Sequence, residues 1–99
     1  MHAQLTTIEA SPARLDDAIH YFREQVLPQL HQTDGFKGFI FLSDRRSGKL
    51  LGVALWENEE VMRSIEEVLS RTRGGISHPP GGAVVGAENY AVSIFEVSS

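Results

Sequence analysis

The chain has 99 residues, a formal net charge of −4 and 22% charged residues, which is typical of one domain of an ordinary water-soluble protein. The acidic balance argues against a nucleic-acid partner, because phosphate backbones select basic surfaces. The absence of cysteine excludes disulfides, thiolate metal ligands and thiol nucleophiles. We find no secretory leader pattern and no apolar run near the ~20 residues that span a membrane. We therefore expect one domain over residues 1–99, located in the cytoplasm and without a membrane partner.

The first part of the chain predicts a strand followed by a helix. Residues 2–9 favour a strand, and Ser11 followed by Pro12 marks a helix start with the serine side chain as its cap. Pro28 is expected to kink or end this helix near Leu27. At about 100° per residue, one helix face collects Leu15, Ile19, Phe22, Val26 and Leu30, with Ala18 at its edge.

A hairpin and a second helix follow. Residues 36–43 and 49–56 are apolar runs joined by the turn SDRRSGK, in which Gly48 suits a positive φ. Asn58, with two glutamates behind it, is the expected cap of a second amphipathic helix that ends near the RGG sequence.

The last part of the chain predicts a loop and a strand. Residues 74–87 are rich in glycine and proline and form a predicted connection of about 14 residues, longer than most in compact domains. We also consider a short strand at residues 83–85 within it. The run NYAVSIFEV, residues 89–97, predicts the final strand.

The order strand, helix, strand, strand, helix, strand predicts an α+β, ferredoxin-like βαββαβ fold. Right-handed crossovers place both helices on one face of a four-stranded antiparallel sheet. Both alternating sets of strand side chains are apolar, as in Phe39 and Phe41 against Ile40 and Leu42. Because the helices cover only one face, we predict a homodimer through the helix-free sheet face. The alternative is that this face is simply exposed.

Three motifs carry a resemblance to a known family. The GFKGF entry to the second strand, the DRRSGK hairpin, and LWENEE, a strand ending in Trp before a capped acidic helix start, occur in this order of elements. Together they resemble the antibiotic biosynthesis monooxygenase-like proteins of the dimeric α/β-barrel superfamily. The resemblance implies two ferredoxin-like protomers packed sheet against sheet, with a pocket between each sheet and its helices. Some members oxidise phenolic or quinol-type substrates with dioxygen and no metal or flavin, and others degrade haem.

The haem-degrading branch does not fit these residues. The resemblance implies, for that branch, an asparagine on the first strand together with a Trp and a His on the second helix. Here the first strand offers Gln4, Thr6 and Thr7, and residues 61–73 contain neither Trp nor His. We therefore reject haem degradation, and we expect no cofactor.

Few residues are candidates for chemistry. The four histidines show no pair at metal-ligand spacing, so we expect no metal site. His78, followed by two prolines in the long connection, is the candidate general base, since its ordinary pKa lies near neutrality; otherwise it is a solvent-exposed loop residue. Trp56 is a candidate substrate-binding wall or else a core residue that pins the second helix to the sheet. Tyr90 has the same two alternatives.

Two functions of different classes follow. The first is a cofactor-independent monooxygenase-like enzyme acting with dioxygen on a small aromatic, quinol or polyketide-type substrate. An apolar pocket with one base is chemically sufficient for this, because the protein mainly stabilises a deprotonated substrate and excludes water. The second is a non-catalytic dimeric module that binds a small hydrophobic ligand or a protein. An isomerase or lyase on the same fold is a third possibility.

Overall fold

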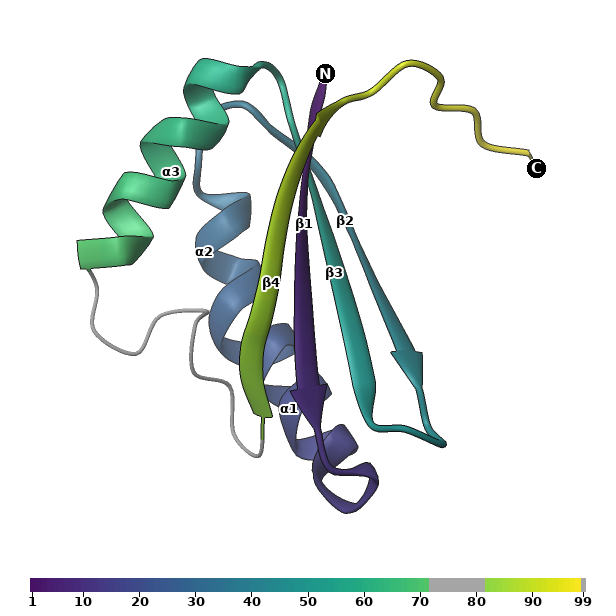
Figure 1. Ribbon diagram of the computed structural model, residues 1–99. Helices are drawn as coiled ribbons and strands as arrows, with labels where there is room; N and C mark the ends of the chain where they lie inside the picture. Colours follow the sequence, from purple (N-terminus) through teal and green to yellow (C-terminus); the bar gives the residue numbers. More distant parts are fainter. Residues whose placement is uncertain (72–81, 99) are drawn as a thin grey trace.

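The computed structural model describes the backbone of residues 1–71 and 82–98, and the side chains of residues 1–65 and 84–98. Its elements run from β1 to β4 in the order that the sequence predicts (Figure 1). Their bounds are β1 His2–Ala10, η1 Pro12–Arg14, α1 Leu15–Tyr21, η2 Phe22–Val26, α2 Leu27–His31, β2 Phe36–Asp44, β3 Lys49–Trp56, α3 Glu59–Arg71 and β4 Gly82–Ala91.

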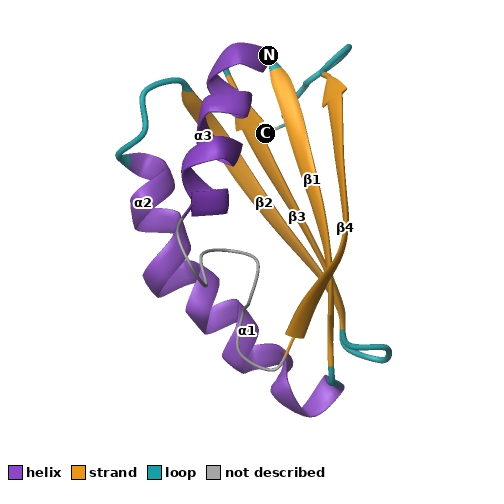
Figure 2. Ribbon diagram, turned by 60° about the vertical axis from the view of Figure 1, so that its left-hand side comes forward, coloured by secondary structure: helices purple, strands orange, loops and turns teal. Residues whose placement is uncertain are grey.

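The four strands form one antiparallel sheet in the order β2-β3-β1-β4. The continuous segment from α1 to α2 and the separate helix α3 lie on the same side of this sheet (Figure 2). The other side carries no helix in the part of the chain that the structure describes. This arrangement confirms the predicted ferredoxin-like α+β fold, because the crossover from β1 to β2 and that from β3 to β4 place their helices on the same face of the sheet.

The two helix starts differ in how their first backbone N–H groups are satisfied. The Asn58 side chain accepts a hydrogen bond from the Val61 N–H at 2.9 Å, so the predicted cap is confirmed. Ser11 makes no side-chain cap, and the prediction for its hydroxyl was wrong. Its carbonyl oxygen instead accepts from the Arg14 N–H at 2.9 Å, because the chain begins with the tight 3₁₀ turn η1 before it widens into α1.

The hairpin between β2 and β3 closes on Gly48, whose φ of +82° confirms the predicted positive value. The Gly48 carbonyl oxygen accepts a hydrogen bond from the Ala10 N–H at 2.9 Å. A Cβ atom at position 48 would lie 2.0 Å from the Ala10 carbonyl oxygen. The end of β1 and the hairpin therefore approach so closely that only glycine fits.

The hydrophobic core lies between the helices and the side of the sheet that faces them. Its buried side chains are Ile8, Ala10, Leu15, Ala18, Phe22, Val26, Leu30, Leu50, Ala54, Trp56 and Met62. This list contains all members of the predicted helix stripe except Ile19, which is half-buried, whereas Ala18 is fully buried. Ile19 instead lines a cavity, as described below.

The last strand lies earlier in the chain than predicted. β4 spans Gly82–Ala91 and pairs with β1 from Ala10, opposite Gly82, to His2, opposite Ala91. Residues 92–97 are not strand, so the prediction of a strand over residues 89–97 was wrong in its second half. The predicted loop over residues 74–87 is likewise wrong from Gly82 onward, where the short strand considered at residues 83–85 falls within β4, and residues 74–81 lie outside the described residues. The ladder with β1 ends at the pair His2 and Ala91, and past it the Val92 N–H donates to the Met1 carbonyl oxygen at 3.0 Å.

Within the described residues, none of the helices has the length and apolar character that a membrane crossing requires.

Candidate ligand-binding site

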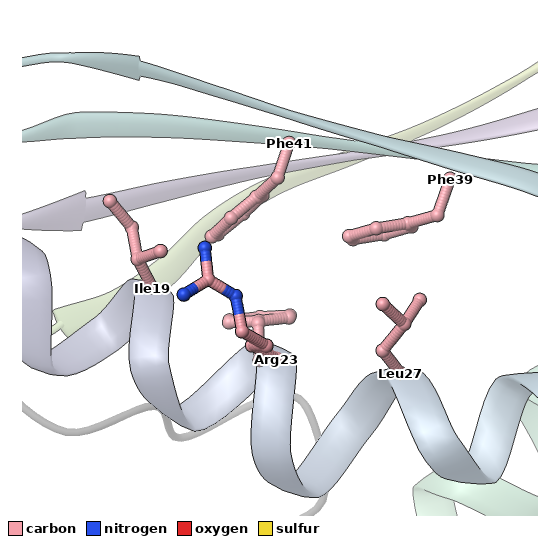
Figure 3. Close-up of a pocket in the computed structure, with 6 residues that line it drawn as sticks. Ile19, Arg23, Leu27, Phe39 and Phe41 are labelled. Atoms are coloured by element: carbon pink, nitrogen blue, oxygen red, sulfur yellow. The ribbon is translucent and has the colours of Figure 1, made fainter.

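A cavity of about 200 Å³ opens between the first helical segment and the outer strand β2. It is lined by Ile19, Phe22, Arg23, Leu27, Phe39 and Phe41, and we call it the outer cavity. Figure 3 shows Phe39 and Phe41 pointing from β2 toward the helix, which presents Ile19, Arg23 and Leu27 from below. An apolar cavity of about 150 Å³ is enough to bind benzene, so this one suits a ligand of one or two rings.

Three phenylalanine rings form the wall of the outer cavity. Phe22 stacks on Phe39 with centroids 6.4 Å apart and an interplanar angle of 12°. Phe41 lies 4.6 Å from Phe22 and 5.8 Å from Phe39, both as centroid distances. Such offset rings provide flat, polarisable surfaces against which another aromatic ring can pack.

The helix places its lining residues through a change of hydrogen-bond pattern. Residues Phe22–Val26 form a π-helical segment, in which the Leu27 N–H donates to the Phe22 carbonyl oxygen. Pro28 explains the change, because it has no N–H to continue the α-helical pattern to residue 24. The helix does not end near Leu27 but continues to His31. Since a π turn holds about 4.4 residues, Ile19, Arg23 and Leu27, four residues apart, stay near one line facing β2.

A second, smaller space of about 20 Å³ lies deeper between the helices and the sheet, and we call it the inner space. It shares Phe22 and Phe39 with the outer cavity, so these two rings separate the two spaces. Its polar lining residues are Gln4 and Thr6 of β1, and Gly52 leaves room on β3. A volume of this size accommodates one water molecule or another molecule of two or three atoms.

Gln4 has a defined orientation at the inner space. Its side chain is buried, and its Oε1 accepts a hydrogen bond from the Trp56 Nε1–H at 3.3 Å. Because an indole N–H only donates, the atom that faces it must be the amide oxygen, and the Gln4 NH₂ group points elsewhere. The Trp56 hydrogen bond therefore fixes which end of the Gln4 amide meets its other neighbours.

The structure places the three site residues predicted from the sequence in different regions. Trp56 is fully buried, stacks edge-on against Phe36, and lines neither space, which agrees with the core role that we considered for it. Tyr90 is 51% exposed. Trp56 pairs with His2 and Tyr90 with Ala3, so Tyr90 points to the helix-free face, opposite to Trp56. His78 lies outside the described residues.

The pKa of the Tyr90 phenol is raised by a neighbouring side chain on the helix-free face. The nearby negative charge of Glu88, together with a hydrogen bond to it, raises the pKa of the Tyr90 phenol above its ordinary value of 10.0. Glu88 and Tyr90 are two residues apart on β4 and therefore share the helix-free face. A phenol with a raised pKa stays neutral at physiological pH.

Arg23, Gln4, Phe39 and Phe41 line the two spaces without having been predicted as site residues. The only sequence signal for the outer cavity is the spacing of Ile19, Arg23 and Leu27, which sets a charged residue between two apolar ones on a helix flank. The inner space depends on pairing between distant strands and has no local signal. No group of three or more His, Asp or Glu side chains gathers as a metal site in the described part of the chain.

Comparison with known proteins gives relatives of undefined function. No protein-family model matches the sequence. The chain is 42% identical to uncharacterized protein Rv2558 of Mycobacterium tuberculosis over 69 residues, which are 69% of this chain and 29% of that protein. It is 33% identical to uncharacterized protein Rv2557 of the same organism over 82 residues, 83% of this chain and 37% of that protein. The chain thus spans about a third of the length of these relatives.

Solved structures share the fold at low sequence identity. A monooxygenase from the gene ActVA-Orf6 of Streptomyces coelicolor, in complex with Nanaomycin D, has a TM-score of 0.74 and 16% identity, covering 99% of this chain and 92% of that chain. The heme-degrader MhuD of Mycobacterium tuberculosis has a TM-score of 0.72 and 17% identity, covering 98% and 100%. SnoaB, a cofactor-independent oxygenase from Streptomyces nogalater, has a TM-score of 0.67 and 9% identity, covering 95% and 94%.

These likenesses concern the fold, because a fold shared at such low identity is compatible with different chemistry. The likeness to a heme-degrader therefore does not alter the residue pattern on which we rejected haem degradation. The arrangement of the sheet and helices nevertheless confirms the resemblance that the sequence motifs carry. The chain has the ferredoxin-like fold of the antibiotic biosynthesis monooxygenase-like proteins.

Proposed function

We propose that this chain is a cofactor-independent monooxygenase-like enzyme that oxidises a small aromatic, quinol or polyketide-type substrate with dioxygen. The single observation that carries the proposal is the pair of adjacent spaces, an aromatic-walled outer cavity and a much smaller inner space behind Phe22 and Phe39. The outer cavity has the size for one or two rings, and the inner space has the size for dioxygen. Structures with this fold include monooxygenases and a cofactor-independent oxygenase, which supports the same class of reaction.

The proposed reaction balances without an external reductant. A phenol and dioxygen give a quinone and water, so the substrate supplies all four electrons, and one oxygen atom enters the new carbonyl while the other leaves as water. A base first removes the phenolic proton, and the electron-rich anion then transfers an electron to dioxygen. Recombination forms the C–O bond, and loss of water from the peroxide gives the carbonyl. The protein must hold the anion in a dry site, which the three phenylalanines favour.

Gln4 and Trp56 fit this proposal as a pair. Gln4 lines the inner space, and Trp56 fixes the orientation of its amide through the hydrogen bond to Oε1. Trp56 would therefore act as a positioning residue rather than as a wall of the site. The roles of His78 as general base and of Tyr90 in substrate binding stay predictions from the sequence.

A test follows dioxygen uptake with an electrode, using hydroquinones and naphthol-type phenols, against heat-treated protein and the His78→Ala variant. We expect one dioxygen consumed per substrate, and a quinone that carries one labelled oxygen when the gas is ¹⁸O₂. Loss of uptake in His78→Ala would support that residue as the base, and unchanged uptake would remove its role.

A single methyl group tests the inner space. A Cβ atom at Gly52 would meet the nearest ring atoms of Phe39 and Phe41 at 3.5 and 3.6 Å, which is ordinary contact, so Gly52→Ala fills the inner space without a clash. We expect Gly52→Ala to bind the aromatic substrate but to turn it over slowly, with a raised KM for dioxygen. Gly86→Ala on β4 is the matched control, because its Cβ would lie 3.8 Å from Thr7, away from both spaces. Equal turnover in both variants would contradict the assignment of the inner space.

One observation favours a second candidate function, a non-catalytic module that binds small hydrophobic ligands. Among the described residues, the linings of the outer cavity and the inner space contain no carboxylate and no imidazole that could act as a base. Binding of naphthols without dioxygen consumption, across the whole panel and with His78 dispensable, would support this alternative.

We also propose that the protein forms a homodimer through its helix-free sheet face. Ile40 and Leu42 of β2 are 45% and 49% exposed on that face, beside the half-buried Leu51 and Val53 of β3. A second copy related by a two-fold axis presents the same apolar surface and covers it. Light scattering after size exclusion should give a dimer mass, and Leu42→Lys should give a monomer. A wild-type monomer at micromolar concentration would contradict this proposal.

A further inference from the structure

Among the described residues that line the outer cavity, Arg23 is the charged one. Its side chain rises from the helix beside Ile19 and toward Phe41 (Figure 3). The residue as a whole is solvent-exposed, so its guanidinium sits at the mouth and the apolar side chains lie behind it. A ligand whose rings fill the cavity would therefore place a substituent next to this cation.

Within the part of the chain that the structure describes, no carboxylate forms an ion pair with Arg23. Three other arginines form ion pairs with carboxylates, namely Arg14 with Asp17, Arg45 with Asp16 and Arg63 with Glu59. Arg23 forms no such pair with any residue that the structure describes. The neighbouring His20 and Glu24 line a different groove on the outer side of the helix and do not reach into the cavity.

We propose that the outer cavity selects aromatic ligands that carry an anionic oxygen group, which Arg23 binds at the cavity mouth. The guanidinium is planar and always charged, and its donors match a carboxylate in pairs or a single phenolate or enolate oxygen. This inference deepens the proposed function by naming the substrate class of the same site. It also gives Arg23 a role in it, because a cation beside the phenolic oxygen favours the deprotonated form that reacts with dioxygen.

The cation also accounts for selectivity against other small apolar molecules. The chain as a whole carries a net charge of −4, so its long-range field does not attract anions. Selection of an anionic ligand must then come from a local contact, and Arg23 is the group that supplies one at this cavity. The three phenylalanines contribute affinity for the rings, which is the same for neutral and anionic ligands.

The test compares two probes that share their rings and differ in charge. At neutral pH 2-naphthoate is an anion and 2-naphthol is neutral, and isothermal titration calorimetry measures the Kd of each. A charge-assisted hydrogen bond at a partly exposed site predicts that wild type binds 2-naphthoate roughly 5 to 30 times more tightly than 2-naphthol. The preference should shrink as salt is added.

Variants separate the role of Arg23 from general charge. In Arg23→Gln we expect equal affinity for the two probes, with 2-naphthol binding as in wild type, and in Arg23→Lys a partial preference. Arg14→Gln is the matched control, because it removes the same charge from the same helical region and should keep the full preference. A wild type without preference, a preference that survives in Arg23→Gln, or no binding of either probe would overturn the inference. These measurements need no turnover, so failure of the proposed oxidation would show separately, as probe binding without dioxygen uptake.

Discussion

The buried hydrogen bond between Trp56 and Gln4 allows a sharp prediction about stability. Trp56→Phe removes the indole N–H and leaves the Gln4 Oε1 buried without this donor, at a cost of about 1–3 kcal/mol. The smaller ring also leaves a void of roughly 40 Å³, worth about 1 kcal/mol at ~24 cal/mol per Å³. We therefore expect the free energy of unfolding to fall by about 2–4 kcal/mol.

A double-mutant cycle separates the hydrogen bond from the void. Gln4→Leu alone leaves the Trp56 N–H buried without its acceptor and should cost about 1–3 kcal/mol. Gln4 makes a further interaction as well, but its loss enters both sides of the cycle and cancels. The double variant Trp56→Phe/Gln4→Leu removes both the indole N–H and the amide oxygen, so neither is left buried without the other. Its cost should be less than the sum of the single costs by about 1–3 kcal/mol.

Urea unfolding followed by far-UV circular dichroism measures all four proteins, with the slope m compared to check that unfolding stays two-state. Additivity of the two single costs within about 0.5 kcal/mol would refute the reasoning, because uncoupled residues add to that accuracy. Trp56 would then stabilise the fold by packing alone, and the orientation of the Gln4 amide at the inner space would need another cause.

Two further predictions concern the hairpin and the helix-free face. Gly48→Ala should lower the free energy of unfolding by about 2–4 kcal/mol, because alanine is strained at positive φ and its Cβ would displace the Ala10 backbone. Urea unfolding measures this loss, with Gly86→Ala as the control. A loss under about 1 kcal/mol in Gly48→Ala would contradict the prediction. Glu88→Gln should lower the pKa of Tyr90 toward its ordinary value, measured as tyrosinate absorbance against pH, and an unchanged titration would remove Glu88 as the cause. The raised pKa also makes the free energy of unfolding depend on pH, because the folded state keeps the Tyr90 proton above pH 10.0, where the unfolded state loses it. The contribution of Tyr90 to stability is therefore present below pH 10.0 and is lost as the pH rises through the folded pKa.

Much of the fold follows from local patterns in the sequence. The alternation of apolar residues predicts β2 and β3, and Gly48 and Asn58 mark a turn and a helix start that the structure confirms. The last strand could not be placed in this way. The run NYAVSIFEV has the stronger strand propensity, yet the glycine-containing segment Gly82–Ala91 is the one that pairs, because the length of β1 decides where its neighbour begins and ends.

The candidate site was harder to predict for a physical reason. The rare residue types that stand out in the sequence, Trp56 and Tyr90, lie on opposite faces of the sheet. The cavity is instead built from common residues, with Phe22 on a helix meeting Phe39 and Phe41 on a strand. Such a meeting depends on the packing of distant segments and on the π-helical turn, and neither has a signature in a short stretch of sequence.

The π-helical turn at Phe22–Val26 has a consequence for how proteins with this fold gain or lose a ligand site during evolution. A π turn amounts to one extra residue within a helix, so deletion of a single residue there would restore an ordinary α-helix and could leave the core intact. The residues inside the turn would, however, shift relative to β2, and Arg23 would leave the line that it shares with Ile19 and Leu27. A one-residue deletion could therefore abolish the ligand site in a stable protein, and a one-residue insertion in a regular helix could create one.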